Sequence, residues 1–183
     1  MSEVQPVKII TVKPGNTLPQ KYTVPPAAKR NAPLNEGVKD KTLERFVAVD
    51  NKNKVVGCAG VYQPKTGVKA AAKYIAGRNP KNYSNQNAFV AHTLNETKRI
   101  LTPKKTFVLD KMGSVQKGVG TQLVNKVKTV ARSRGVSSID GYTANSVSGF
   151  YKKQGATITK INYLVNSRGM PRNEFSIKIR GKR

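Results

Sequence analysis

Residues 106–135 constrain the fold of this 183-residue chain more than any other part of it. Residues 106–110 (TFVLD) have the apolar, β-branched character of a strand, and a glycine-bearing stretch, residues 113–120, follows. Apolar residues then recur at the i, i+4, i+7 and i+8 spacing of one helix face, and Gly135 is placed to end that helix. A strand that passes through a short turn into an amphipathic helix predicts an α/β fold.

Strand and helix patterns on both sides of this segment extend the prediction. Their order is two strands, an insertion, then strand, helix, strand, helix and two strands, which favours a mixed β-sheet flanked by helices over a bundle or a sandwich. Asn145 is predicted as the N-cap of the last helix and Gly155 as its end. The remaining predicted strands are 45–49, 55–62, 136–144, 159–165 and 175–179, and the predicted helices are 68–78, 89–101 and 146–154.

The first 36 residues differ from the rest. After a strand-like stretch at 7–12, they contain five prolines and few apolar residues. Proline lacks a backbone donor and fixes φ, so this stretch is predicted to hold neither a helix nor a central strand. We expect an extended N-terminal arm over residues 1–36, packed on a surface of this chain or of a partner, and a single domain over residues 37–183. A partly disordered tail is the alternative.

The charge of the chain restricts its partners. Lys and Arg number 34 against 9 Asp and Glu, a net charge of +25, so DNA, RNA, an acidic protein or an anionic surface are all candidate partners. The single cysteine, Cys58, and the single histidine, His92, argue against disulfides and metal sites, and both are expected to be packed residues. With no apolar run of about 18 residues, we expect an intracellular protein, or one packaged in a viral or ribonucleoprotein particle.

The stretch of residues 115–121 (VQKGVGT) is the first candidate site. Small residues let backbone N–H groups approach a ligand, and the following helix adds partial positive charge at its N-terminus, so a phosphate or pyrophosphate suits this turn. The dinucleotide-binding fingerprint is excluded because Leu123 stands where its third glycine is needed, and the Gly-Lys-Ser/Thr of a P-loop is absent. Two glycines before a helix are also typical of a plain tight turn.

A second segment, residues 145–156 (NSVSGFYKKQGA), follows one predicted strand and precedes another. In order and spacing, this segment and the glycine turn together resemble the GNAT superfamily of N-acetyltransferases. The resemblance extends roughly over residues 44–62 and 106–180 and is strongest at 107–156. It implies an α/β fold, acetyl-CoA as cofactor and an amine as acetyl acceptor.

Individual roles follow from the resemblance alone. Asp110 and Lys111 are implied to offer backbone groups to the pantetheine arm. Asn145 is implied to lie near the pantetheine and sulfur, and Tyr151 to protonate the leaving thiolate, although its spacing is also typical of a core residue. The sequence departs from the family at Val115, where Gln or Arg is usual, and at Ala156, where an aromatic residue is usual. The residues implied to hold the pyrophosphate are Gln116, Lys117, Gly118, Val119, Gly120 and Thr121.

Two functional hypotheses follow. The motif pair favours an acetyl-CoA-dependent N-acetyltransferase. The charge and the departures from the motif favour a catalytically degenerate, GNAT-like binding protein within a virion or a nucleoprotein assembly. Tyr74 and Tyr83 lie among basic residues, a combination suited to stacking on single-stranded bases.

Overall fold

The computed structural model describes residues 7–83, 85–102, 105–165 and 171–179. The chain divides into two compact units. The first comprises Met1–Tyr62 and Val108–Arg134, and the second comprises Gln63–Phe107 and Gly135–Arg183. Each unit is described by itself.

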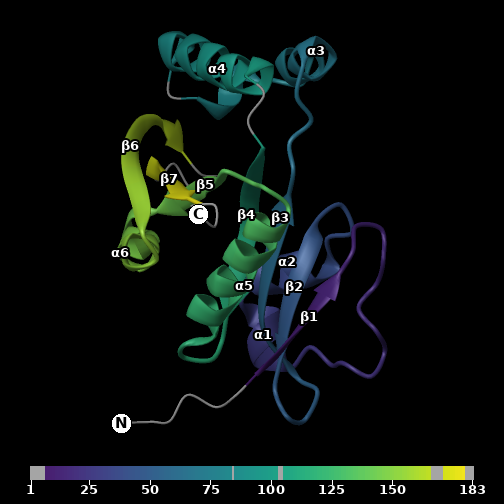
Figure 1. Ribbon diagram of the computed structural model, residues 1–183. Coiled ribbons are helices and arrows are strands. Elements are labelled where there is room, and N and C mark those ends of the chain that lie inside the picture. The colour runs from purple at the N-terminus through teal and green to yellow at the C-terminus, as the bar shows by residue number, and fades with distance from the viewer. Residues whose placement is uncertain (1–6, 84, 103–104, 166–170, 180–183) are drawn as a thin grey trace. The chain divides into compact units, whose positions relative to one another are not determined.

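The first unit is an antiparallel sheet with helices on both faces (Figure 1). Its strands, each antiparallel to the next, are β1 (Lys8–Val12), β2 (Glu44–Val49), β3 (Val55–Tyr62) and β4 (Thr106–Ser114). Its helices are α1 (Pro26–Arg30), α2 (Ala32–Lys39) and α5 (Val119–Ser133).

Two neighbouring residues of β3 show which helix covers which face. A Cβ atom on Gly57 would lie 2.5 Å from Cγ1 of Val119, so this face touches α5. The next residue, Cys58, points the other way, with its Sγ 3.4 Å from the position of a Cβ on Gly37 of α2. Because successive side chains of a strand alternate between faces, α5 and α2 pack on opposite sides of the sheet.

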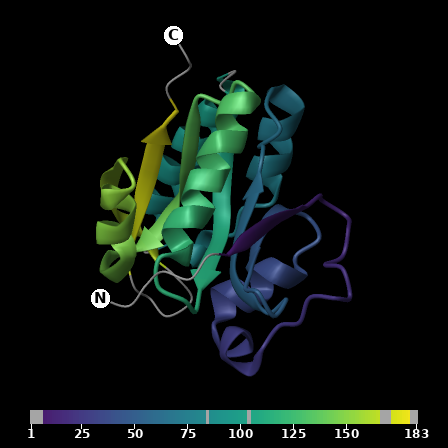
Figure 2. The same ribbon diagram turned by 60° about the horizontal axis from the view of Figure 1, so that its bottom comes forward.

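Helix α1 and the first residues of α2 lie within the stretch predicted to be an extended arm. That prediction was wrong about the prolines: Pro26 is the first residue of α1 and Pro33 the second of α2. In the first turn of a helix the N–H has no intrahelical acceptor, so proline costs nothing there. Ala28 and Leu34 are fully buried, so this segment supplies part of the core. Figure 2 shows the purple-to-blue ribbon of this segment, with its two short helices. The strand at 7–12 is confirmed as β1, whereas a domain boundary at residue 36 stays a prediction.

A buried arginine fastens this segment to the sheet. Arg45 of β2 is 1% exposed, and its Nη1 donates a 2.6 Å hydrogen bond to the carbonyl of Val38 near the end of α2. Its Nη2 donates to the carbonyl of Asn16 in the loop after β1. Carbonyls at a helix C-terminus carry partial negative charge and suit a cation. Burial lowers the pKa of Arg45 from its ordinary value.

The second unit holds the remaining elements. Phe175 of its central strand stacks on Tyr151 of α6 (Asn145–Lys153), and Phe175 pairs in register with Gly141. Tyr142 therefore points to the opposite face, where its hydroxyl donates a 3.3 Å hydrogen bond to Oε1 of Glu96 on α4 (Gln86–Leu101). The strands, in the antiparallel order β5-β7-β6, are β5 (Ser138–Ala144), β7 (Pro171–Lys178) and β6 (Ala156–Val165). The helices are α3 (Val68–Ala76), the 3-10 turn η1 (Pro80–Asn82), α4 (Gln86–Leu101) and α6 (Asn145–Lys153).

Most predicted elements are confirmed, with shifted ends. Strand β4 continues to Ser114, four residues beyond the predicted end. Gly135 and Gly155 have left-handed φ values of 64° and 81°, which confirms them as helix ends. Asn145 was wrongly predicted as an N-cap: Ala144 holds that position, and no side chain caps α6. The strand predicted at 175–179 begins too late, because β7 begins at Pro171, and residues 166–170 lie outside the described residues.

Candidate functional site

The glycine turn joins β4 to α5 in the first unit. The N–H of Val115 donates a 2.9 Å hydrogen bond to the carbonyl of Val56, which extends the sheet one residue past β4. Gly118 is the N-cap of α5 with φ 82° and ψ −21°, a left-handed conformation that favours glycine. Val119 is fully buried, Gly120 is half-buried, and Lys117 is exposed. The turn therefore carries few side chains between the end of the sheet and the start of the helix.

The N-terminus of α5 has no compensating side chain. This 15-residue helix has no side-chain cap and no acidic residue in its first turn. In α2, by contrast, Oδ1 of Asn31 accepts a 3.2 Å hydrogen bond from the N–H of Leu34. The partial positive charge at the start of α5 is thus not offset by the helix's own residues, an arrangement suited to an anion.

Strand β4 bulges at one of the predicted residues. Lys111 pairs with Gly60 and Leu109 with Val61, so Asp110 is the additional residue of the bulge. Its side chain is exposed. A bulge bends a strand and redirects its backbone groups, and bulges are frequent beside active sites.

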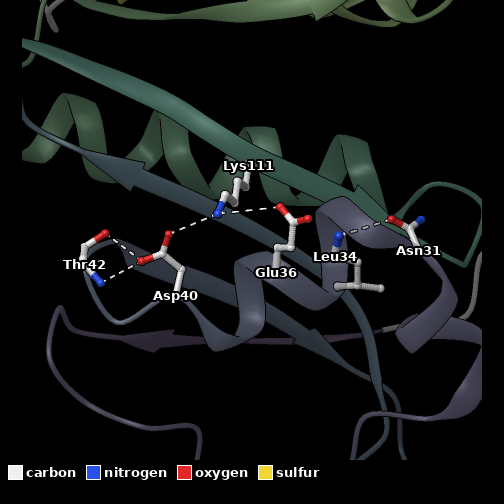
Figure 3. A network of polar contacts seen from close by, with 6 residues as sticks. All are labelled: Asn31, Leu34, Glu36, Asp40, Thr42 and Lys111. Carbon is white, nitrogen blue, oxygen red and sulfur yellow. Dashed lines mark hydrogen bonds and ion pairs between the residues drawn. The ribbon is translucent and has the colours of Figure 1, made fainter. Parts of the chain in front are cut away.

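The side chain of Lys111 is engaged inside the first unit (Figure 3). Its Nζ lies 3.3 Å from Oδ2 of Asp40 and 3.7 Å from Oε2 of Glu36. The pKa of Asp40 is lowered, chiefly by the hydrogen bond from the hydroxyl of Thr42 and further by Lys111. Lys111 therefore ties β4 to α2 through its side chain, and its predicted role remains one for the backbone.

In the second unit, Asn145 belongs to a polar network that the sequence did not reveal. Its Oδ1 accepts a 2.6 Å hydrogen bond from Nδ2 of Asn173, which also donates to Oγ of Ser148 at 2.8 Å. Ser148 in turn donates to the carbonyl of Ala144 at 3.2 Å. Asn173 is only 5% exposed, so it fixes the orientation of the exposed Asn145. The sequence did offer one signal for this network: Asn173 is a polar residue at the alternating spacing of the buried Phe175 and Ile177, so it points to the same face of β7.

Tyr151 is a core residue by its packing. It is 6% exposed, its ring stacks on Phe175 with centroids 4.0 Å apart and an interplanar angle of 12°, and Phe150 contacts its edge. Burial raises the pKa of Tyr151 to about 12. The phenol therefore keeps its proton at neutral pH, the form needed to donate a hydrogen bond or a proton.

The other side chains considered in the sequence analysis are packed inside the protein or against neighbouring side chains. Burial raises the pKa of the Cys58 thiol to about 12, so it is a poor nucleophile. His92 is 6% exposed beside the rings of Tyr83 and Tyr142. The Arg78 guanidinium lies 4.2 Å from the Tyr74 ring centroid, and Tyr83 packs edge-on against Phe89. This packing gives no support to the predicted base-stacking platform.

The predicted site residues fall into two groups. The structure brings Asp110, Lys111 and residues 116–121 into the first unit, and Asn145 and Tyr151 into the second. Among the described residues, no group of three or more His, Cys, Asp or Glu side chains is placed to hold a metal ion. Within the same residues, no helix is long and apolar enough to span a membrane.

Comparison with solved structures defines the class of fold. A polyamine N-acetyltransferase from Drosophila melanogaster superposes with a TM-score of 0.51 at 11% identity, covering 73% of this chain and 74% of that one. A GNAT family acetyltransferase from Elizabethkingia anophelis, solved with acetyl-CoA bound, has a TM-score of 0.49 at 15% identity, covering 94% and 97%. The chain therefore shares the fold of this polyamine N-acetyltransferase, and the predicted α/β class with a mixed sheet is confirmed. No family model and no curated protein sequence matches the chain.

Proposed function

We propose that the chain is an acetyl-CoA-dependent N-acetyltransferase that transfers an acetyl group to an amine. One observation carries the proposal: the uncapped N-terminus of α5 follows the left-handed Gly118 directly after the bulged strand β4. An anion-binding helix end beside a redirected strand suits a ligand with a pyrophosphate and an extended arm. The solved polyamine N-acetyltransferase with the same fold supports acetyl transfer to an amine, and the resemblance of the two motifs implies acetyl-CoA as the ligand.

Each predicted residue has a physical task in this proposal. When bound, acetyl-CoA supplies an acetyl thioester that an amine can attack. The amides of residues 116–121 hold the pyrophosphate, and the backbone at Asp110 and Lys111 orients the pantetheine arm. Asn145, held by Asn173, presents a polar group of fixed direction toward the pantetheine and sulfur.

Tyr151 supplies a proton or a hydrogen bond to the sulfur as the C–S bond breaks and the C–N bond forms, while the amine proton leaves to water. A pKa of about 12 makes complete transfer to a thiolate of ordinary pKa (about 8.5) unfavourable by about 5 kcal/mol. Hydrogen-bond donation to the developing negative charge is therefore the principal role we assign to its hydroxyl.

The anion site can be tested by placing a negative charge in it, with circular dichroism of each variant as the check on folding. Gly120→Asp puts a carboxylate in the first turn of α5, where it favours the helix but repels a pyrophosphate. Asn125→Asp makes the same charge change at an exposed position one turn later. We expect calorimetry to show saturable CoA binding by the native chain and by Asn125→Asp, and at least tenfold weaker binding by Gly120→Asp. Absence of CoA binding by the native chain, or equal binding by all three, would contradict the proposal.

A second candidate function is that of a basic binding protein on the same fold, in which catalysis has been lost. Two observations favour it: the net charge of +25, and Val115, 42% exposed, where the resembling family has a polar residue. Such a protein would contact nucleic acid or an acidic neighbour in a virion or nucleoprotein assembly. Binding to DNA or RNA should then weaken steeply with added salt, as measured by fluorescence anisotropy. Weak nucleic-acid binding that does not change with salt, together with saturable CoA binding, would exclude this second function and favour the acetyltransferase.

A further inference from the structure

Strand β1 leaves one edge of the sheet open. It is the last strand at one end of the strand order, the purple arrow in Figure 1, and within the described residues it pairs with β2 alone. In the same part of the chain, no backbone hydrogen bond connects residues 8–12 to any segment other than β2. Alternate residues of such a strand direct both N–H and C=O away from the partner. The outer edge of β1 therefore carries donors and acceptors that another extended backbone can complete.

The side chains of β1 alternate between the two faces of the sheet. Val12 is buried in the core cluster that α1 and α2 share, and Ile10 packs against the same cluster, so Lys8 lies on this face too. Ile9 and Thr11 lie on the other face. Lys8 and Thr11 are exposed, and Ile9 and Ile10 are half-buried. A strand added to this edge therefore has one residue directly beside Lys8 and apolar neighbours on both faces.

A cavity of about 440 Å³ lies at the beginning of this edge. Its lining comes from the start of β1, the end of β2 and the turn that follows β2. The lining residues are Val7, Lys8, Val49, Asp50, Asn51 and Asn53. Sites that bind a peptide as an added strand combine an open edge, which pairs with the peptide backbone, with a pocket that selects a side chain. The edge of β1 and this cavity supply both parts.

The polar lining of the cavity is rich in hydrogen-bond donors. The ammonium of Lys8 and the side-chain amides of Asn51 and Asn53 supply N–H groups. The carboxylate of Asp50 is engaged within the turn, where its Oδ1 accepts hydrogen bonds of 2.9 and 2.8 Å from two backbone N–H groups. A carboxylate side chain on the added strand suits this lining. Directly beside Lys8, it also forms a cross-strand pair of opposite charge.

Exposed lysines at both ends of the edge restrict the partner. Lys8 begins β1, Lys13 follows it directly, and Lys52 lies between two lining residues of the turn. Lysines on a strand edge discourage pairing with chains of like charge, so a second copy of this chain, with a net charge of +25, is disfavoured. Nucleic acid lacks the alternating amide donors and carbonyl acceptors that complete a sheet edge. The complementary partner is an extended peptide that carries acidic residues.

We propose that the edge of β1 and the adjoining cavity bind an extended acidic segment of another protein as an additional strand. The backbone of that segment pairs with residues 8–12, and a β-branched residue packs beside Ile10. A Glu or Asp side chain enters the cavity beside Lys8, and a second acidic residue lies near Lys13 at the other end. This function is separate from acetyl transfer and does not depend on it.

The probe is a fluorescein-labelled synthetic peptide with the central sequence Glu-Val-Thr-Val-Thr-Glu, whose acidic ends suit either strand direction. Its binding to the full-length chain is measured by anisotropy at physiological salt, beside a peptide of the same composition with both Glu residues at the centre. We expect saturable binding of the probe in the micromolar range and at least tenfold weaker binding of the second peptide. Lys8→Glu should weaken binding of the probe at least tenfold, whereas Lys69→Glu, the same charge change at an exposed lysine on α3, should leave it unchanged. Circular dichroism reports whether both variants remain folded.

Backbone methylation of the probe tests strand addition directly. In an added strand, alternate N–H groups point toward β1 and the others point away. Of two probes methylated on alternate amides, one should therefore bind at least tenfold more weakly and the other should bind as the parent does. Equal binding of the two methylated probes, or equal effects of Lys8→Glu and Lys69→Glu, would overturn the proposal. So would a chain that dimerises in sedimentation and is dissociated by the probe, since a second copy would then occupy the edge.

Discussion

Replacing Tyr151 by Phe separates its packing role from the role of its hydroxyl. Phe keeps the ring that stacks on Phe175 at 4.0 Å and removes only the O–H group. At pH 7 the free energy of unfolding should therefore stay within about 1 kcal/mol of the native value. Turnover with acetyl-CoA and an amine should fall by about tenfold to a hundredfold if the hydroxyl stabilises the leaving thiolate.

The hydroxyl also makes stability depend on alkaline pH. Burial raises the pKa of Tyr151 from an ordinary 10.0 to about 12 in the folded chain. A raised folded-state pKa contributes stability that is fully present below pH 10 and is lost as the pH rises toward 12, because the unfolded chain gives up its proton first. At pH 11 this loss amounts to about 1.4 kcal/mol, one pH unit at 1.36 kcal/mol per unit.

The assay is urea unfolding followed by circular dichroism at pH 7, 9 and 11 for native chain and Tyr151→Phe. Other groups that titrate in this range, Cys58 included, are common to both and cancel in the difference. We expect the stability of the native chain to fall by about 1.3 kcal/mol more than that of the variant between pH 9 and 11. If Tyr151→Phe and the native chain lose stability in parallel, the hydroxyl is hydrated in the folded state and this reasoning fails.

Three further predictions test the packing. Gly57→Ala should lower the free energy of unfolding by about 1–3 kcal/mol in urea titrations, because its Cβ would meet Val119 at 2.5 Å. Gly149→Ala, inside α6 with open space around it, should raise the free energy of unfolding by about 0.5–1 kcal/mol. A change of the same sign in both variants would contradict this prediction. Arg45→Met should cost about 2–4 kcal/mol in the same titrations because two carbonyls lose their donor, and unchanged stability would show that water replaces it. Asn173→Leu should lower both the free energy of unfolding and kcat for acetyl transfer, because it releases the side chain of Asn145. If stability falls and kcat does not, the orientation of Asn145 is irrelevant to catalysis.

The success of the sequence analysis depended on how local each signal was. The helix α5 was predictable because Leu123, Val124, Val127 and Ala131, all buried, repeat along one face. The turn before it was predictable because glycine permits the left-handed conformation found at Gly118. Both signals are complete within about twenty consecutive residues, and neither needs a partner from elsewhere in the chain.

The errors arose where position within an element or a distant partner decided the outcome. Proline was taken to exclude helices, yet Pro26 and Pro33 lie in first turns, where the rule does not apply. The side chain of Lys111 was not expected to pair with Asp40, 71 positions away. Asn173 likewise acts on Asn145 across 28 positions. Contacts of this kind are set by tertiary packing, and no periodicity reports them.

The acidic residues show how the large positive charge fits the fold. Glu36 and Asp40 pair with Lys111, and Glu44 makes two hydrogen bonds of 2.6 and 2.7 Å with Arg134. Others hold turns and strands: Asp50 accepts hydrogen bonds from the N–H groups of Lys52 and Lys54, and Asp140 from the hydroxyl of Ser176. Carboxylates used to fasten elements together are not available to offset cations elsewhere on the surface. These carboxylates therefore do little to offset the net charge of +25, and that excess of cations is the reason why the second candidate function names an anionic partner.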